Sequence, residues 1–114
     1  MFLKLQLKRL NDVGEYVKIA ETKAVLKNQM QVFNAKGQEI LVINVEGKFY
    51  ALENRCPHMG YPLFFGNLEG DTLTCGFHSA KFNVRTGKSV GPVTSEPLKT
   101  FPVKIQNSSI FIEV

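Results

Sequence analysis

Cysteine and histidine are scarce in this chain, and tryptophan is absent. The 114 residues include only two cysteines, too few for the disulfide framework that holds many small secreted domains together. An apolar core must therefore stabilise the fold, and a hydrophobic content of 44% is sufficient for one. The length is typical of one domain, so we expect residues 1–114 to form a single unit.

The chain also lacks a long apolar segment. No stretch approaches the ~20 apolar residues that a membrane-spanning helix needs. Charged residues interrupt the apolar ones within 1–9, which leaves no apolar core for a signal peptide. We expect a soluble protein without a membrane span. Both cysteines stand beside histidines, as metal ligands do in a reducing compartment, which predicts a cytoplasmic location.

A third absence is any basic run with interleaved aromatic residues. The 14 Lys and Arg residues outnumber the 10 Asp and Glu residues, for a formal net charge of +4, but the lysines are scattered. Nucleic acid is therefore not an expected partner. The positive excess fits either an ordinary solvated surface or the steering of a partner with an acidic docking surface.

All the cysteine and histidine residues lie in two short motifs, Cys56-x-His58 and Cys75-x-x-His78, with residues 59–74 between the two pairs. Thiolates and imidazoles together are ligands for zinc or for an iron–sulfur cluster. Zinc sites commonly pair cysteine with cysteine and histidine with histidine at short spacing, whereas each motif here supplies one of each. The pattern favours iron.

Strand-like segments dominate the rest of the chain, which predicts an all-β fold. Alternating apolar residues predict a first strand at Leu3–Leu7, and Gly47 is expected to adopt positive φ in a hairpin turn. One helical turn is compatible with 20–27. The other expected strands lie within 16–20, 31–33, 40–45, 48–52, 71–74, 80–84, 98–105 and 110–114. Five glycines near the motifs are interpreted as ordinary turn residues: Gly60, Gly66, Gly70, Gly87 and Gly91.

The two motifs and their flanks resemble the Rieske ferredoxins. The spacing of the pairs is that family's signature. Residues 47–55 lead into the first motif as they do in the family, 82–87 look like its Phe-Asp-x-x-Thr-Gly segment, and Gly91-Pro92 look like its proline-containing loop. About residues 16–114 fit. Residues 1–15 have no counterpart and are expected to be an N-terminal extension or an edge strand.

The resemblance implies a Rieske-type fold of antiparallel sheets with a small cluster-binding subdomain made of two loops. It implies one 2Fe-2S cluster per chain, with Cys56 and Cys75 on the buried iron and His58 and His78 on the iron nearest the surface. Keeping the thiolate charge inside, among backbone N–H donors, agrees with that assignment.

Members of the family's high-potential branch carry an extra cysteine in each loop, which form a disulfide, and Ser and Tyr hydroxyls that donate to sulfur. The matching positions here hold Tyr61, Phe77, Ala80 and Phe82. No disulfide can form, and Ala80 and Phe82 offer no hydroxyl. Because lost donors disfavour the more negative, reduced cluster, we expect a potential near the low end of the Rieske span of roughly −150 to +300 mV.

Aromatic residues cluster around the first motif. We expect at least one of Phe64 and Phe65 in the core. An apolar surface is expected around the histidine edge, formed by Met59, Tyr61, Pro62 and Leu63.

The predicted function is that of a soluble one-electron carrier between a reductase and a terminal oxygenase or other redox enzyme. With both histidines used by the cluster, no 2-His-1-carboxylate iron site can form, and neither a catalytic triad nor a phosphate-binding glycine motif is present. No independent enzyme activity is expected. Two alternatives stay open: a small Rieske subunit of a larger redox enzyme such as nitrite reductase, and a zinc-binding interaction module.

Overall fold

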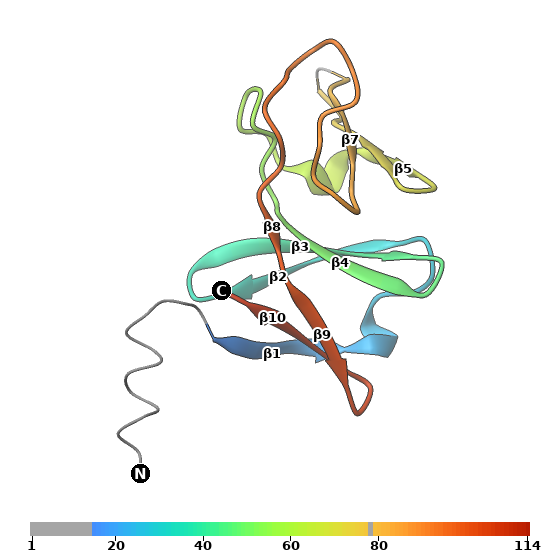
Figure 1. Cartoon of the computed structure of the whole chain (residues 1–114), viewed down its shortest axis with the longest axis vertical. Coiled ribbons are helices and arrows are strands. Elements are labelled where there is room, and N and C mark those ends of the chain that lie inside the picture. The colour runs from blue at the N-terminus through green and yellow to red at the C-terminus, as the bar shows by residue number, and fades with distance from the viewer. Residues whose placement is uncertain (1–14, 78) are drawn as a thin grey trace.

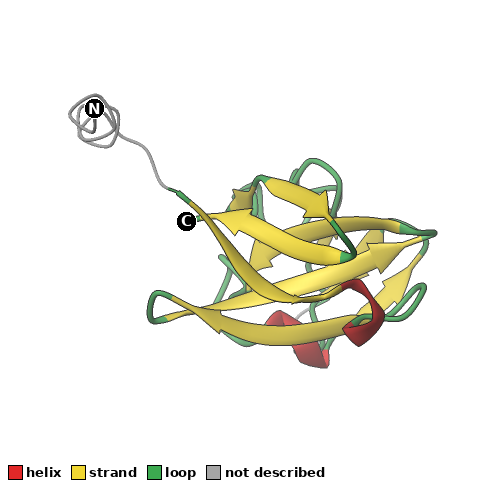
Figure 2. Ribbon diagram, turned by 90° about the horizontal axis from the view of Figure 1, so that it is seen from below, coloured by secondary structure: helices red, strands yellow, loops and turns green. Residues whose placement is uncertain are grey.

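The computed structural model describes residues 15–77 and 79–114, so the strand expected at Leu3–Leu7 lies outside the described residues. These residues form antiparallel strands with two short 3-10 turns, as Figure 2 shows. Their order is β1 (Tyr16–Glu21), η1 (Thr22–Ala24), β2 (Met30–Ala35), β3 (Gln38–Val45), β4 (Lys48–Glu53), η2 (Leu63–Phe65), β5 (Asn67–Glu69), β6 (Thr72–Thr74), β7 (Lys81–Asn83), β8 (Thr100–Phe101), β9 (Val103–Gln106) and β10 (Ser109–Glu113). The all-β prediction is confirmed.

The strands form three sheets that lie one above another in Figure 1. The order is β1-β10-β9 in the first, β2-β3-β4-β8 in the second and β5-β6-β7 in the third. The first two sheets form a base. The third sheet and the loops around it form a smaller subdomain at one end. In the described part of the chain, no helix is long and apolar enough to cross a membrane.

Strand β3 lies between two apolar cores, because both of its faces are buried. Ile40 and Val42 point to the core shared with the first sheet, while Leu41 and Ile43 point to the core beneath the small subdomain. A strand covered on both faces has a continuous apolar run instead of strict alternation. This apolar run is the clearest signal of a strand in the sequence.

Tight turns join β2 to β3 and β3 to β4. Glu46 and Gly47 both have positive φ, +49° and +95°, as a two-residue type I′ hairpin turn requires. The prediction for Gly47 is confirmed.

The single strand expected at 98–105 is wrong, because the structure contains two strands there. Pro102 separates β8 from β9, since proline has no N–H to continue the ladder. The break moves the chain from one sheet to the next: β8 pairs with β4, and β9 pairs with β10. Strand β5, in which only the middle residue is partly buried, was not expected from the sequence.

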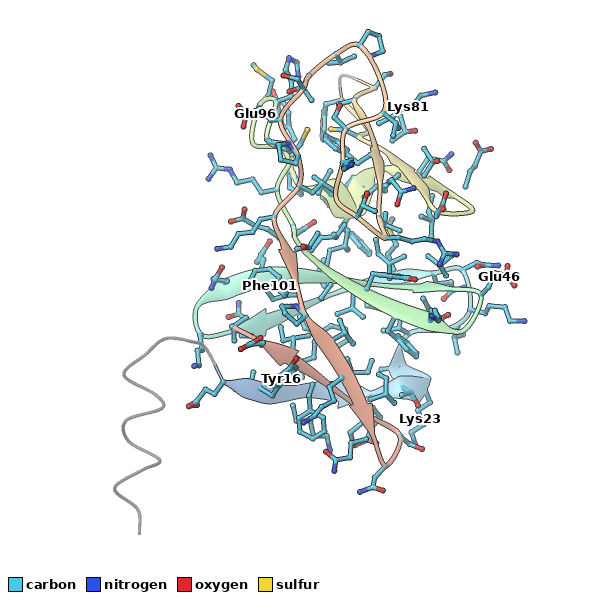
Figure 3. All side chains as sticks on the ribbon, viewed as in Figure 1. Tyr16, Lys23, Glu46, Lys81, Glu96 and Phe101 are labelled. Carbon is cyan, nitrogen blue, oxygen red and sulfur yellow. The ribbon has the colours of Figure 1, made fainter. Side chains whose placement is uncertain are left out.

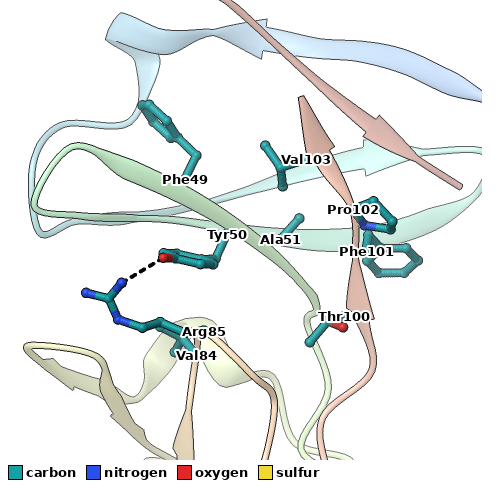
Figure 4. Close-up of a pocket in the computed structure, with 9 residues that line it drawn as sticks. All are labelled: Phe49, Tyr50, Ala51, Val84, Arg85, Thr100, Phe101, Pro102 and Val103. Atoms are coloured by element: carbon teal, nitrogen blue, oxygen red, sulfur yellow. Dashed lines mark hydrogen bonds between the residues drawn. The ribbon is translucent and has the colours of Figure 1, made fainter. Parts of the chain in front are cut away.

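A cleft of about 350 Å³ marks the junction between the small subdomain and the base (Figure 4). Arg85 lies beside it and donates to Tyr50 Oη at 2.8 Å and to Asp71 Oδ2 at 3.1 Å. Tyr50 belongs to β4, and Asp71 precedes β6 in the small subdomain. This arginine therefore links the subdomain that carries the Cys/His loops to the sheet below it.

Candidate metal centre

The two cysteines lie side by side inside the small subdomain. Cys56 follows β4 and Cys75 follows β6, and their exposed fractions are 0% and 1%. Both are free thiols within one apolar cluster, and the side chain of Cys75 lies close enough to Cys56 to raise the pKa of its thiol. Two residues that lie 19 positions apart in the chain are thus brought together, as the sequence-based interpretation requires.

The loops that follow the two cysteines have the same hydrogen-bonding pattern. Cys56 N–H donates to Tyr61 O at 2.8 Å, and Cys75 N–H donates to Ala80 O at 2.7 Å. Four residues after each cysteine, Gly60 N–H and Ser79 N–H return to the cysteine carbonyls at 2.7 and 3.1 Å.

Both returning residues have positive φ, +81° for Gly60 and +59° for Ser79. The chain therefore turns back through the left-handed region at the same step of each loop. The structure presents two matched turns, each beginning at a buried thiol.

The surroundings of Cys56 suit a metal-bound thiolate. Burial raises the pKa of the Cys56 thiol above its ordinary value, and the neighbouring Cys75 adds to the rise, while the backbone N–H groups of His58 and Met59 donate to the sulfur and oppose it. A bound cation supplies the positive charge that deprotonates such a thiol. Two adjacent buried sulfurs with backbone donors therefore fit the sulfur side of an iron–sulfur cluster.

The structure describes only one of the two histidines. His58 is half-buried in the turn of Cys56, whereas His78 lies outside the described residues. Within 15–77 and 79–114, no three metal-binding side chains already converge on one point. The structure thus unites Cys56 with Cys75, and the full four-residue ligand set stays a prediction.

The aromatic segment after the first loop corrects two expectations. Phe64 and Phe65 are both exposed, at 36% and 66%, so the expected core phenylalanine is wrong. Leu63, expected at the surface, is fully buried. The short turn η2 explains the exchange, because it directs its first side chain into the core and the next two outward. Met59 and Tyr61 are exposed, as expected.

Asn54 is a positioning residue that the sequence analysis missed. Its buried side chain accepts the Phe64 N–H at 2.9 Å and donates to Glu39 Oε1 at 3.1 Å. Its own N–H donates to the Glu39 carbonyl at 3.0 Å. Asn54 therefore fixes both ends of the first loop to the start of β3. In sequence, an asparagine beside a loop looks like any solvated turn residue.

Two matched loops lie at one end of an antiparallel β-fold, and each begins at a buried cysteine that is followed within three residues by a histidine. This arrangement defines a small β-sheet metalloprotein that binds its metal between two loops. The chain belongs to the Rieske 2Fe-2S domain family, whose profile matches residues 15–102. The cofactor is accordingly a 2Fe-2S cluster of the Rieske type.

Curated relatives of this chain are ferredoxin components of dioxygenases. The biphenyl 2,3-dioxygenase ferredoxin component of Rhodococcus jostii (strain RHA1) is 36% identical over 97 residues, which cover 85% of this chain and 91% of that protein. The biphenyl dioxygenase ferredoxin subunit of Pseudomonas sp. (strain KKS102) is 38% identical over 77 residues, 67% of this chain and 71% of that protein.

One solved structure has a fold similar to that of this chain. It is titled a complex of reduced oxygenase and oxidized ferredoxin in carbazole 1,9a-dioxygenase. The match has a TM-score of 0.81 and 28% identity, covering 86% of this chain and 92% of the matched one. The family, fold and cofactor expected from the two motifs are confirmed.

Proposed function

We propose that this protein is a one-electron carrier that takes an electron from a reductase and delivers it to a terminal oxygenase. The observation that carries the proposal is the pair of buried cysteines in matched loops, on a chain that spans 91% of a ferredoxin component. Its relatives are named as the ferredoxin component or ferredoxin subunit of a dioxygenase, which favours an electron carrier to an oxygenase over a small subunit of another redox enzyme.

Four residues would hold the cluster. Cys56 and Cys75 would bind the inner iron, because their sulfurs are adjacent and buried. His58 and His78 would bind the outer iron, since neutral imidazoles tolerate the rim of the subdomain better than thiolates do. The bound cluster supplies a site that stores one electron at a time. The loops exclude water from its sulfur side.

The proposal assigns no independent catalytic site to the chain and places it in the cytoplasm. The two histidines of the sequence are both allotted to the cluster, which leaves no imidazole for a second iron. Both thiols are free and form no disulfide with each other, as expected of metal ligands in a reducing compartment.

One preparation tests the proposal. The purified protein should be red-brown, with two irons and two labile sulfides per chain and a paramagnetic signal after reduction. Mixing the reduced protein with a terminal oxygenase and its substrate should reoxidise it. A colourless protein with one zinc per chain would instead establish the zinc module. Constant co-purification with a large subunit would establish the subunit alternative.

The side of the fold around the loops is apolar with few charges, which leads to a first prediction. Exposed apolar side chains there include Met59 at 58%, Phe65 at 66% and Phe77 at 53%. Figure 3 shows Lys81 and Glu96, of opposite charge, at this end. Between residues 54 and 98 the charged residues nearly balance: Arg55, Lys81, Arg85 and Lys88 against Glu69, Asp71 and Glu96.

We therefore expect partner docking to depend weakly on salt, because steering by net charge is small at this end of the molecule. The second-order rate of electron transfer to the oxygenase should change less than about twofold between about 50 and 200 mM salt. Stopped-flow absorbance measures it. A steep fall with salt would show that the overall charge of +4 steers an acidic partner after all.

The residues behind the cysteines lead to a second prediction. Ala80 and Phe82 are fully buried in the apolar cluster that contains Cys56 and Cys75, and neither has a hydroxyl. Ala80→Ser should raise the reduction potential, because a hydroxyl donor stabilises the reduced cluster more than the oxidised one. If the hydrogen bond stabilises the reduced cluster by about 1 kcal/mol more than the oxidised one, the potential rises by roughly 40 mV for a one-electron couple.

A redox titration of the purified variant gives the measurement. Val84→Thr is the matched control, since it adds a hydroxyl to another buried position of the same cluster, four residues farther along the chain. An equal shift in both variants, or a fall for Ala80→Ser, would contradict a donor effect at the cluster sulfur.

A further inference from the structure

Two aromatic rings join the loops that follow Cys56 and Cys75. The rings of Tyr61 and Phe77 are stacked, with centroids 4.2 Å apart and an interplanar angle of 23°. Tyr61 comes from the first loop and Phe77 from the second. Both rings stay partly exposed, at 38% and 53%, so the stack lies on the outside of the loops and not in the core.

The positions of these rings are coupled to the two cysteines. The Tyr61 carbonyl accepts the Cys56 N–H at 2.8 Å, which ties the base of that ring to the first thiol. Phe77 lies two residues after Cys75, inside the turn that Cys75 N–H and Ala80 O close at 2.7 Å. Each of these hydrogen bonds stays within one loop. The ring stack, in contrast, connects one loop to the other.

We propose that Tyr61 and Phe77 form a clamp that holds the two loops at a fixed spacing and slows the loss of the cluster. The inference rests on the proposed function, since it takes the two loops to be the ligand loops. A cluster bound by both loops leaves only when they separate, which is a local opening of the fold. Stacked aromatic pairs stabilise the closed arrangement beyond the surface they bury, so the open arrangement becomes rarer.

A double-mutant cycle on the cluster-loaded protein tests the clamp. Tyr61→Ala and Phe77→Ala should each release iron to a chelator about three- to tenfold faster than wild type. The double variant should release it no faster than the quicker single variant, because the second substitution has no remaining stack to break. Tyr61→Phe and Phe77→Tyr keep two rings and should retain the slow release.

Phe65→Ala is the matched control. Phe65 is a more exposed aromatic residue of the same subdomain, at 66%, and its ring meets Phe64 of the same turn edge to face. Its truncation should leave iron release unchanged. Multiplying rates in the double variant, or equal acceleration by Phe65→Ala, would overturn the clamp.

Amide hydrogen exchange of the loaded protein gives a second readout. The alanine variants should exchange faster within 58–61 and 76–80, while the buried strand β3 keeps its protection. Equal acceleration in β3 would mean general destabilisation and would overturn the clamp. If the wild-type chain held zinc, the proposed function would fail, but the same cycle read from zinc release and amide exchange would still decide on the clamp.

Discussion

Cys75→Ser is expected to leave the protein without its cluster. Cys75 is 1% exposed and its side chain meets that of Cys56, so it lies where the inner iron would bind. A serine hydroxyl nearly matches the thiol in size but does not ionise as readily, and it is a poor ligand for iron of this type. We expect iron content to fall at least about tenfold, since disturbing even the surroundings of a metal ligand costs affinity by 10–100-fold.

Iron and sulfide analysis with the visible spectrum measures the effect. Ser79→Gly is the control in the same loop: Ser79 has φ +59°, which glycine adopts more easily, and it is not a predicted ligand. That variant should keep its cluster. Cys56→Ser should behave as Cys75→Ser does. Full iron occupancy in either serine variant would remove that cysteine from the ligand set.

The sequence was most informative where chemistry depends on residue type alone. Thiols and imidazoles are rare in this chain, so Cys56, His58, Cys75 and His78 could be predicted as cluster ligands without coordinates. Strand β3 was equally plain, because burial on both faces requires an apolar run. Such signals are local, and they need no knowledge of what packs against them.

Positions whose role depends on distant neighbours could not be predicted in the same way. Three consecutive apolar residues, such as 63–65, show no periodicity in the sequence. Their pattern therefore could not predict that Leu63 is buried while Phe65 is exposed. The positions of Tyr61 and Phe77 could be matched to those of a disulfide found in relatives. Whether their rings meet depends on how the two loops are placed, and only the structure shows the stack.

Glycines show the same limit. Gly66 was interpreted as an ordinary turn residue, but neither Gly66 nor Gly76 has positive φ. Both are needed for close approach. A Cβ on Gly76 would lie 2.7 Å from the Phe65 carbonyl oxygen, and a Cβ on Gly66 would lie 2.2 Å from the Thr74 carbonyl oxygen. The segment after the first loop is thus packed backbone to backbone against the start of the second.

Gly66→Ala is therefore expected to cause the largest loss of stability among single substitutions at these glycines. The new Cβ would meet backbone, which cannot move aside as a flexible side chain can, and Thr74 directly precedes Cys75. We expect the free energy of unfolding to fall by about 2–4 kcal/mol. For a domain of this size that lowers Tm by roughly 10–20 °C.

Thermal unfolding followed by circular dichroism measures the loss, with Gly91→Ala as the matched control. A Cβ on Gly91 would meet nothing closer than Lys81 Cβ at 3.6 Å, an ordinary contact, so that variant should stay within about 0.5 kcal/mol of wild type. The clash also displaces the backbone of Thr74, which directly precedes Cys75. Gly66→Ala should therefore lose iron faster even at temperatures where it remains folded. Equal Tm values for the two alanine variants would mean that the segments separate without cost, and the packing at Gly66 would then contribute nothing to holding the two cysteines together.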